Sequence, residues 1–288
     1  GGHMALPAQE TINTVYRQAF PNLPVTPAML ERSLRLSDPA QTIQIRFNDK
    51  GAPIAACVYN DNGIGLLAVV PEHQNEGLGS ALLRQAEDAL RQRGATRVAL
   101  GCAGSYLFPG VPECLPGVSA FFEHRGYRSA WTCVDLTMDL TRARLPDLPS
   151  PSLQAAIRPC AEADRSMLLD SVAKVEPHWV DFYAACPSED ILIAIGPEGI
   201  VGFVQLLRSG IRMEALLPGR TGGLGCLGVL PGHRERGIGL NLANAATRTL
   251  QRAGFDTSYI GYTWLEDWYG RLGYRRFLSY WMGEKALA

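Results

Sequence analysis

The sequence predicts an α/β protein made of two related domains, each a mixed β-sheet flanked by helices. The chain has 288 residues, about twice the usual size of a single domain. A segment of its first half reappears in its second half, 160 residues later. In each copy, short apolar runs typical of strands precede and follow a longer segment with the apolar period of a helix.

The repeat is clearest around two glycines. Val70–Gly79 (VPEHQNEGLG) corresponds to Leu230–Gly239 (LPGHRERGIG), and the match continues without a gap into the following segment. Further on, Phe121–Tyr127 (FFEHRGY) resembles Trp268–Tyr274 (WYGRLGY). There the first copy carries about 13 additional residues around Tyr106–Gly117. One chain therefore contains two versions of one unit.

A proline-rich segment lies between the copies. Arg144–Ser152 holds three prolines and two serines in nine residues, a composition that favours an extended connector and is incompatible with a helix. We therefore predict an N-terminal domain over residues 5–143, a connector over 144–152 and a C-terminal domain over 153–288.

The second copy shows its elements most completely. Weakly alternating or β-branched apolar runs predict strands, and apolar residues at helical spacing predict helices. Gly196–Gly199 reads as a hairpin turn, and Gly254 stands where a helix C-terminus favours a left-handed residue. The first copy follows the same order without an obvious opening strand. The predicted elements are, in order, strand Leu153–Arg158, helix Ala161–Val175, strands Ile191–Ile195, Ile200–Leu207 and Gly223–Val229, helix Gly237–Arg252, strand Thr257–Tyr262, helix Leu265–Leu272 and strand Arg276–Met282.

The repeated segment places an apolar strand, a proline, a polar loop and Gly-x-Gly before a helix. Glycines let the backbone approach a ligand closely, and the free N–H groups of the first helical turn bind anions. In the second copy Arg234 and Arg236 add positive charge to this loop. The pattern favours a pyrophosphate-bearing ligand.

Two other phosphate-binding motifs do not fit. A P-loop needs Gly-Lys-Ser/Thr after the loop, and neither copy has it. Gly223–Gly228 matches the dinucleotide pattern GxGxxG, but it runs on into Val229–Pro231 without opening a helix. We interpret it as a chance match in a glycine-containing strand.

Composition excludes several partners. The formal charge of −1 gives no basic excess for nucleic acid, and no apolar run approaches the roughly 18 residues that span a bilayer. The seven cysteines are scattered and form no CxxC pair, so we expect no metal site and free thiols in a reducing cytoplasm. We expect a monomer or a homodimer.

These motifs resemble those of the GNAT superfamily of N-acetyltransferases. The loop pattern Gln/Arg-x-x-Gly-x-Gly/Ala is similar to its acetyl-CoA-binding motif, which Arg234–Gly239 matches fully and Gln74–Gly79 matches with Gln first. Trp268–Tyr274 resembles the fourth-helix motif of that family. The resemblance covers about residues 40–140 and 153–285, and it implies two tandem GNAT-like domains.

The resemblance implies that the fourth and fifth strands splay apart to admit the pantetheine arm of acetyl-CoA. Backbone groups of the fourth strand would then bind that arm, and N–H groups of the loop would bind the pyrophosphate. An amine of a small molecule would attack the thioester directly, without an acyl-enzyme. The residues so assigned to acetyl-CoA are Leu227, Gly228, Val229, Leu230, Arg234, Glu235, Arg236, Gly237, Ile238, Gly239 and Leu240, with Val69, Val70, Gln74, Asn75, Glu76, Gly77, Leu78, Gly79 and Ser80 in the first copy.

One position separates the copies. In the family, a tyrosine four residues before the glycine of the fourth-helix motif protonates the departing thiolate. That position is Tyr269 in the second copy and Phe122 in the first, and phenylalanine has no proton to give. The first copy also has Glu76 where the second has Arg236. We therefore predict that the C-terminal domain is catalytic and that the N-terminal domain is structural or only binds CoA.

Several alternatives stay open. The protein could be a non-catalytic acyl-CoA-binding scaffold, in which both clefts have lost turnover. It could also transfer a longer acyl group, which would differ only in the depth of the acyl pocket. The proline-containing insert Tyr106–Gly117 is either a wall over a cleft of the first half or a cover between the domains. No general base is assigned. The candidates are Glu176, His178, Glu214, Glu266 and Asp267.

Overall fold

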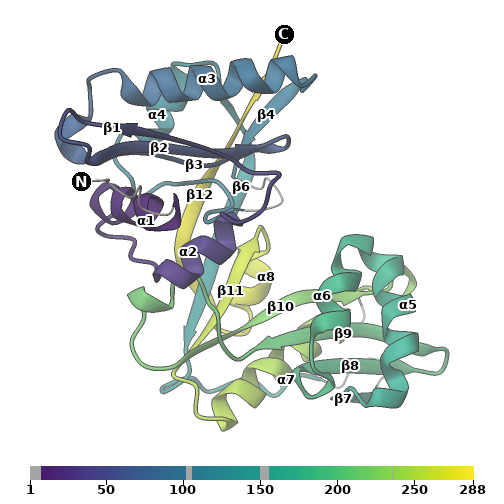
Figure 1. The fold of residues 1–288 in the computed structure, drawn as a ribbon. Helices are drawn as coiled ribbons and strands as arrows, with labels where there is room; N and C mark the ends of the chain where they lie inside the picture. Colours follow the sequence, from purple (N-terminus) through teal and green to yellow (C-terminus); the bar gives the residue numbers. More distant parts are fainter. Residues whose placement is uncertain (1–7, 102–105, 150–155, 236) are drawn as a thin grey trace. The chain divides into compact units, whose positions relative to one another are not determined.

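The computed structural model describes residues 8–101, 106–149, 156–235 and 237–288. The chain divides into two compact units (Figure 1). Unit 1 comprises Gly1–Val134 and Leu278–Ala288, and unit 2 comprises Asp135–Phe277. Each unit contains one copy of the glycine-rich loop, as the repeat predicts.

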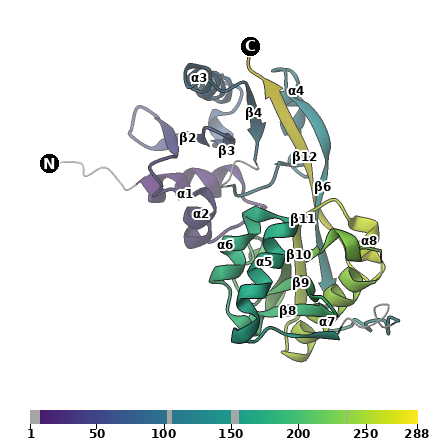
Figure 2. The same cartoon turned by 90° about the vertical axis from the view of Figure 1, so that its right-hand side faces the viewer.

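Unit 1 is a mixed sheet with helices on both faces. Its strands follow the order β1-β2-β3-β4-β12, antiparallel from β1 to β3 and parallel between β3 and β4. Helices α1 and α3 lie on opposite faces of this sheet (Figures 1 and 2). The elements are α1 (Ala8–Ala19), α2 (Pro27–Leu34), β1 (Thr42–Phe47), β2 (Pro53–Asn60), β3 (Gly63–Val69), α3 (Leu78–Gln92), β4 (Arg97–Leu100), β5 (Val111–Pro112), α4 (Val118–Glu123), the first part of β6 (Arg128–Asp139) and the end of β12 (Arg275–Ala286).

The helices of unit 1 follow from their apolar faces. Leu82, Leu83, Ala86 and Leu90 recur at helical spacing along α3, and all four are buried against β2 and β3. The hydroxyl of Thr26 accepts a hydrogen bond from the N–H of Met29 and caps the start of α2.

Unit 2 repeats this architecture. Its strand order is β6-β11-β10-β9-β8-β7; β10 and β11 are parallel, and the pairs from β10 to β7 are antiparallel. Each element predicted for the second copy has a counterpart among the described residues, together with a short additional helix, α6; residues 153–155 of the predicted strand Leu153–Arg158 lie outside the described residues. The elements are β7 (Ala156–Pro159), α5 (Arg165–Val175), α6 (Val180–Ala185), β8 (Ile191–Gly196), β9 (Gly199–Leu207), β10 (Thr221–Val229), α7 (Ile238–Arg252), β11 (Thr257–Thr263), α8 (Glu266–Gly270) and the start of β12.

Strand β9 shows how the two faces of the unit 2 sheet are used. Phe203 packs beside Tyr183 of α6, with ring centroids 5.2 Å apart, in a cluster with Leu168 of α5. The neighbouring Gly202 lies against Leu242 of α7. Because successive residues of a strand point to opposite faces, α5 and α6 cover one face and α7 covers the other (Figure 2).

The closing strands are exchanged between the two halves of the sequence. Glu284 of β12, from the C-terminal half, pairs with Ala99 of β4 in unit 1. Residues 135–139 of β6, from the N-terminal half, belong to unit 2 and lie next to β11. The two units therefore differ from the predicted limits 5–143 and 153–288. A repeat identifies the residues of a unit, but the pairing of a closing strand depends on tertiary contacts.

The described part of the connector, residues 144–149, is bound along α7. Side-chain nitrogens of Asn241, Asn244 and Arg248 donate to carbonyl oxygens of Pro149 and Pro146, at 2.9–3.1 Å. These helix residues are three or four positions apart and so share one face. Connector residues 150–152 lie outside the described residues.

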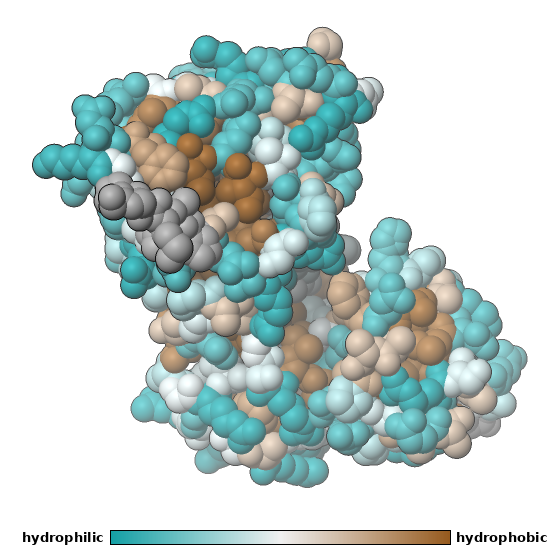
Figure 3. All heavy atoms as spheres, viewed as in Figure 1, coloured by the Kyte–Doolittle hydropathy of each residue, from teal (hydrophilic) through white to brown (hydrophobic). Residues whose placement is uncertain are grey.

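Polar residues cover most of the visible face of each unit, and apolar side chains gather in small patches (Figure 3). In the described part of the chain, no helix combines the length and the apolar character needed to cross a membrane. The six described cysteines are free: Cys57, Cys114, Cys133, Cys160, Cys186 and Cys226.

Candidate functional site

The two glycine-rich loops have the same backbone. Asn75 and Glu235 are both left-handed, with φ of 65° and 64°, and Gly77 and Gly237 follow with φ of 87° and 78°. Glycine adopts such angles without strain, which explains its place immediately before each helix. The sequence repeat is therefore also a repeat of local structure.

Each loop presents free N–H groups at a helix start. The first backbone hydrogen bonds there are donated by Ala81 to Gly77 O in α3 and by Asn241 to Gly237 O in α7, both at 3.0 Å. The N–H groups of the preceding helical residues have no acceptor within the helix. Both loops thus have the backbone of an anion site.

The first motif residue braces the loop. Gln74 Nε2 donates to Val69 O at 3.0 Å, and Arg234 Nε donates to Val229 O at 3.2 Å. Arg234 thus binds the loop to the end of β10, a contact that was not predicted from the sequence. Glu76 Oε2 lies within hydrogen-bond distance of His73 Nδ1, at 3.0 Å. Arg236 lies outside the described residues.

The second glycine of each motif lets the helix pack closely. A Cβ on Gly239 would lie 3.3 Å from the Trp268 ring and 3.5 Å from Val229. A Cβ on Gly79 would lie 3.5 Å from Phe121 and 3.7 Å from Val69. These contacts bring the loop, the preceding strand and the aromatic helix together in both units.

Strands β10 and β11 separate in unit 2. Their parallel pairing runs from Thr221–Thr257 to Leu224–Ile260 and ends there, although both strands continue. A bulge between Gly225 and Gly228 turns β10 at this point. The fork implied by the resemblance is thus present.

The predicted strand residues lie along the β10 side of this fork. Gly228 and Val229 pair with β9. Leu230 N–H donates to Val201 O at 2.9 Å, so Leu230 keeps only its carbonyl for a ligand. Leu227 lies within the bulge between the two sections of β9 pairing.

Tyr269 lies on α8, beside the helix that follows the loop. Its ring meets Trp268 edge-on at 4.8 Å, and its side chain is buried, with 7% of the residue exposed. Among the described residues its hydroxyl has no hydrogen-bond partner. Burial raises the pKa of Tyr269 above the ordinary tyrosine value, so the phenol keeps its proton.

The corresponding region of unit 1 is filled. Strand β4 ends at Leu100, the last residue that pairs with β3, and Gly101 N–H donates to Ile64 O at 2.8 Å. The insert lies against these strands: Phe108, Val111 and Leu115 line an apolar hollow of only about 70 Å³ together with Phe122. The described residues of the insert thus lie beside β3 and the end of β4 in unit 1.

The candidate bases lie in dissimilar places. His178 is 86% exposed and pairs with Glu176 at 3.3 Å, and Glu266 is bound by Arg276 at 2.6 Å. Asp267 is exposed and Glu214 is half-buried. None of these contacts identifies a base.

Sequence reasoning missed one acid, Asp135 of β6. It is buried, and its carboxylate accepts hydrogen bonds from the Tyr259 hydroxyl and from Tyr262 N–H. The available signal was an acid inside the apolar run Cys133–Leu136. Its place beside the second-copy strand β11 depends on the strand exchange.

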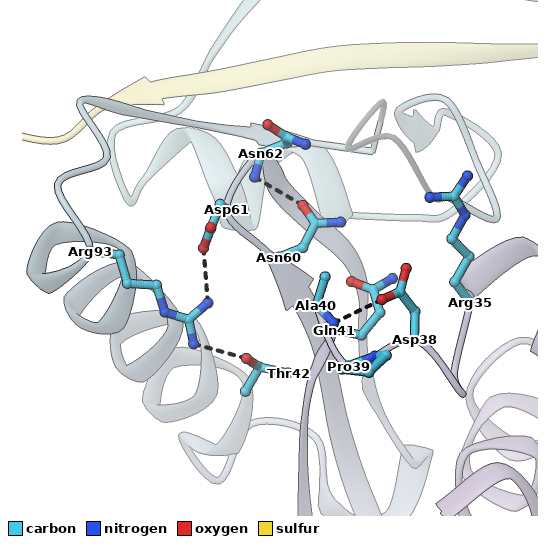
Figure 4. A pocket seen from close by; sticks show the side chains of 10 residues that line it. All are labelled: Arg35, Asp38, Pro39, Ala40, Gln41, Thr42, Asn60, Asp61, Asn62 and Arg93. Atoms are coloured by element: carbon cyan, nitrogen blue, oxygen red, sulfur yellow. Dashed lines mark hydrogen bonds and ion pairs between the residues drawn. The ribbon is translucent and has the colours of Figure 1, made fainter.

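A polar hollow of about 440 Å³ occurs elsewhere in unit 1 (Figure 4). Arg93, at the C-terminal end of α3, binds Asp61 at 3.1 Å and Thr42 at 2.9 Å along one side of it. The glycine-rich loop lies at the other end of that helix, so this hollow is separate from the predicted site.

The model of the acetyltransferase (GNAT) family matches residues 10–107 and 160–274. The chain therefore belongs to the acetyltransferase (GNAT) family, which it matches in two tandem regions. No curated protein sequence matches the chain.

Solved structures share the tandem fold. The chain is similar to the glucosamine N-acetyltransferase region of a fungal multi-domain β-N-acetylglucosaminidase, with a TM-score of 0.85 and 23% identity over 98% of this chain. It spans only 37% of that protein. A GNAT protein from Sphaerobacter thermophilus gives a TM-score of 0.71 with 16% identity, covering 96% of this chain and 92% of that one. A tandem GNAT protein of the clavulanic acid biosynthesis pathway gives 0.67 and 16%, covering 98% and 95%.

Proposed function

We propose that the protein is an acetyl-CoA-dependent N-acetyltransferase that acetylates a primary amine of a small molecule, and that unit 2 carries the chemistry. The observation that carries this proposal is the fork between β10 and β11 with a buried Tyr269 on α8. Unit 1 has Phe122 at the corresponding position, and residues of the insert line a small apolar hollow with it. A cytoplasmic location remains a prediction.

In this proposal acetyl-CoA is a substrate. The N–H groups at the start of α7 hold its pyrophosphate, and the open backbone of β10 takes the pantetheine arm. The amine nitrogen attacks the thioester carbonyl carbon, the carbon–sulfur bond breaks, and the phenol of Tyr269 gives its proton to the departing thiolate. The amine attacks as a neutral nucleophile and must then lose a proton. In this proposal solvent accepts that proton.

The first acceptor class to test is amino sugars, because the fungal region similar to this chain is described as a glucosamine N-acetyltransferase. Release of free thiol from acetyl-CoA should be measured with amino sugars, simple amines and peptide N-termini. We expect release with at least one amine. Its absence across all classes would favour a non-catalytic CoA-binding scaffold.

Matched glycine variants locate the working loop. Gly237→Glu places a carboxylate and an unfavourable φ at the start of α7, and should abolish turnover and acetyl-CoA binding. Gly254→Glu is its control, because Gly254 has a similar φ of 86° with open space at the other end of the helix. The pair Gly77→Glu and Gly94→Glu tests unit 1 in the same way, and loss of turnover in Gly77→Glu alone would contradict the assignment to unit 2.

A further inference from the structure

We propose that Asp135, which the N-terminal half of the sequence contributes to unit 2, is a positioning residue for Tyr269. The inference rests on the proposed function, because it assigns Asp135 to the same site. Asp135 lies on β6 within unit 2 and is 5% exposed.

The carboxylate of Asp135 holds strand β11 at two points. One oxygen, Oδ2, accepts a hydrogen bond from the Tyr259 hydroxyl, and the other, Oδ1, accepts one from Tyr262 N–H at 2.9 Å. A charged acceptor makes hydrogen bonds stronger than those of a neutral one. Asp135 thus ties the middle of β11 to its end.

Tyr262 needs such a restraint. Its φ is 57°, in the left-handed region that an aromatic side chain disfavours. The residue lies beyond the last β10–β11 pair, where strand pairing no longer fixes the backbone of β11 on that side. The hydrogen bond from its N–H to Asp135 therefore stabilises the turn that leaves the strand.

Further hydrogen bonds extend from that turn to Tyr269. Thr263 Oγ1 accepts a bond from Leu265 N–H at 3.1 Å, and Leu265 O accepts one from Tyr269 N–H at 3.0 Å. The short segment from Tyr262 to Tyr269 thus carries two hydrogen bonds, one at its turn and one at the start of α8. A shift of Tyr262 would move the start of α8 and, with it, the predicted general acid.

The contribution of Asp135 has a consequence for the first half of the chain. That half has no tyrosine at the corresponding position, yet the acid of its closing strand restrains the end of β11 in unit 2. If unit 1 has lost turnover, Asp135 of β6 would still be retained, because it serves the site of unit 2.

The test is a double-mutant cycle of Asp135→Ala and Tyr269→Phe. Asp135→Ala should lower kcat by about tenfold or more, since a displacement of about 1 Å costs catalysis heavily, while the acetyl-CoA Kd stays within about twofold. In the Tyr269→Phe background the same substitution should cause no further loss, because its effect passes through the phenol. A substitution that only destabilised the fold would lower kcat by the same factor in the wild-type and Tyr269→Phe backgrounds.

Two further variants keep the cycle interpretable. Asp139→Ala removes an exposed acid of the same strand, one that bonds only within its own turn at Thr141, and should leave kcat unchanged. Asp135→Asn keeps an acceptor oxygen for Tyr262 N–H and should recover part of the rate if Asp135→Ala does not fold.

The outcomes separate the two proposals. A wild-type kcat in Asp135→Ala and Asp135→Asn, with Tyr269→Phe impaired, would overturn the role of Asp135 alone. The same additional loss in both backgrounds would also overturn it. A wild-type rate in Tyr269→Phe would overturn the role of Tyr269 in the proposed function, and with it that of Asp135.

Discussion

The hydroxyl of Tyr183 donates a hydrogen bond to the carbonyl of Cys226 at 2.6 Å. Tyr183 is fully buried on α6, and Cys226 stands in the bulge of β10 with a left-handed φ of 50°. The bond therefore joins a rigid aromatic side chain to the point where β10 turns away from β11. Helix α6 thus stabilises the bulge at which the fork of unit 2 begins.

Tyr183→Phe should loosen this bulge. The free energy of unfolding should fall by about 1–3 kcal/mol, because the carbonyl of the half-buried Cys226 loses its donor, and acetyl-CoA should bind more weakly. Urea denaturation and calorimetry measure the two effects. Tyr16→Phe is the matched control in unit 1: it removes a similar buried bond, to Leu23 O at 2.6 Å, and should cost stability without weakening acetyl-CoA binding. Wild-type binding in Tyr183→Phe would contradict the role of the bulge.

The pH dependence of kcat should reflect the raised pKa of Tyr269. Burial disfavours the phenolate, so the folded enzyme keeps this proton at pH values where an ordinary tyrosine, with a pKa of about 10, begins to lose it. We expect no decline of kcat from this group between about pH 8 and pH 10. A decline with an apparent pKa below about 9 that disappears in Tyr269→Phe would contradict this environment.

Unit 1 contains a buried ion pair that depends on the last strand of the chain. Lys285 Nζ of β12 lies 2.9 Å from Glu87 of α3, and the Tyr127 hydroxyl donates to the same carboxylate at 2.8 Å. Lys285→Met should lower the free energy of unfolding by about 3 kcal/mol, because it leaves a buried carboxylate without its cation.

A second substitution should reverse most of that loss. In unit 2 the positions of Glu87 and Tyr127 are taken by Thr247 and Tyr274, whose hydroxyls lie 2.6 Å apart. Glu87→Thr combined with Lys285→Met copies this neutral arrangement and should be more stable than Lys285→Met alone. Urea denaturation compares the three proteins, and a double variant less stable than the single one would contradict the account of the charge.

The strand exchange makes a prediction about fragments. Residues 153–288 lack the β6 residues 135–139 that belong to unit 2, whereas residues 135–277 contain them. We expect the fragment 135–277 to unfold cooperatively and to bind acetyl-CoA, and the fragment 153–288 to do neither. Circular dichroism during thermal unfolding and calorimetry distinguish them. Cooperative folding and full binding by 153–288 would show that the exchanged strand is dispensable.

Local features were predictable from the sequence. The two loops share left-handed angles at Asn75 and Glu235 because the same residues precede the same helix in each copy. The fork at Leu224–Ile260 follows from the family resemblance, and the alternation of apolar residues placed the strands correctly. The loops and the strands depend on residues close together in the chain, whereas the fork depends on the family resemblance.

Features that depend on distant pairing were not predictable. The repeat does not say which copy each closing strand joins, so Asp135 was not expected beside Tyr262. The composition of the insert left open whether Phe108 would line a hollow beside β3 of unit 1. Arg234 carried a charge suited to phosphate, and its bond to Val229 O became evident only from the path of the loop.

The central claim is that Tyr269 of unit 2 performs the acid step and that its counterpart Phe122 does not. The most direct measurement compares kcat of Tyr269→Phe and Phe122→Tyr, with the acetyl-CoA Kd of each determined by calorimetry. Tyr269→Phe should lower kcat by about 10²- to 10⁴-fold with Kd nearly unchanged, and Phe122→Tyr should leave kcat unaltered. A wild-type kcat in Tyr269→Phe would contradict the account.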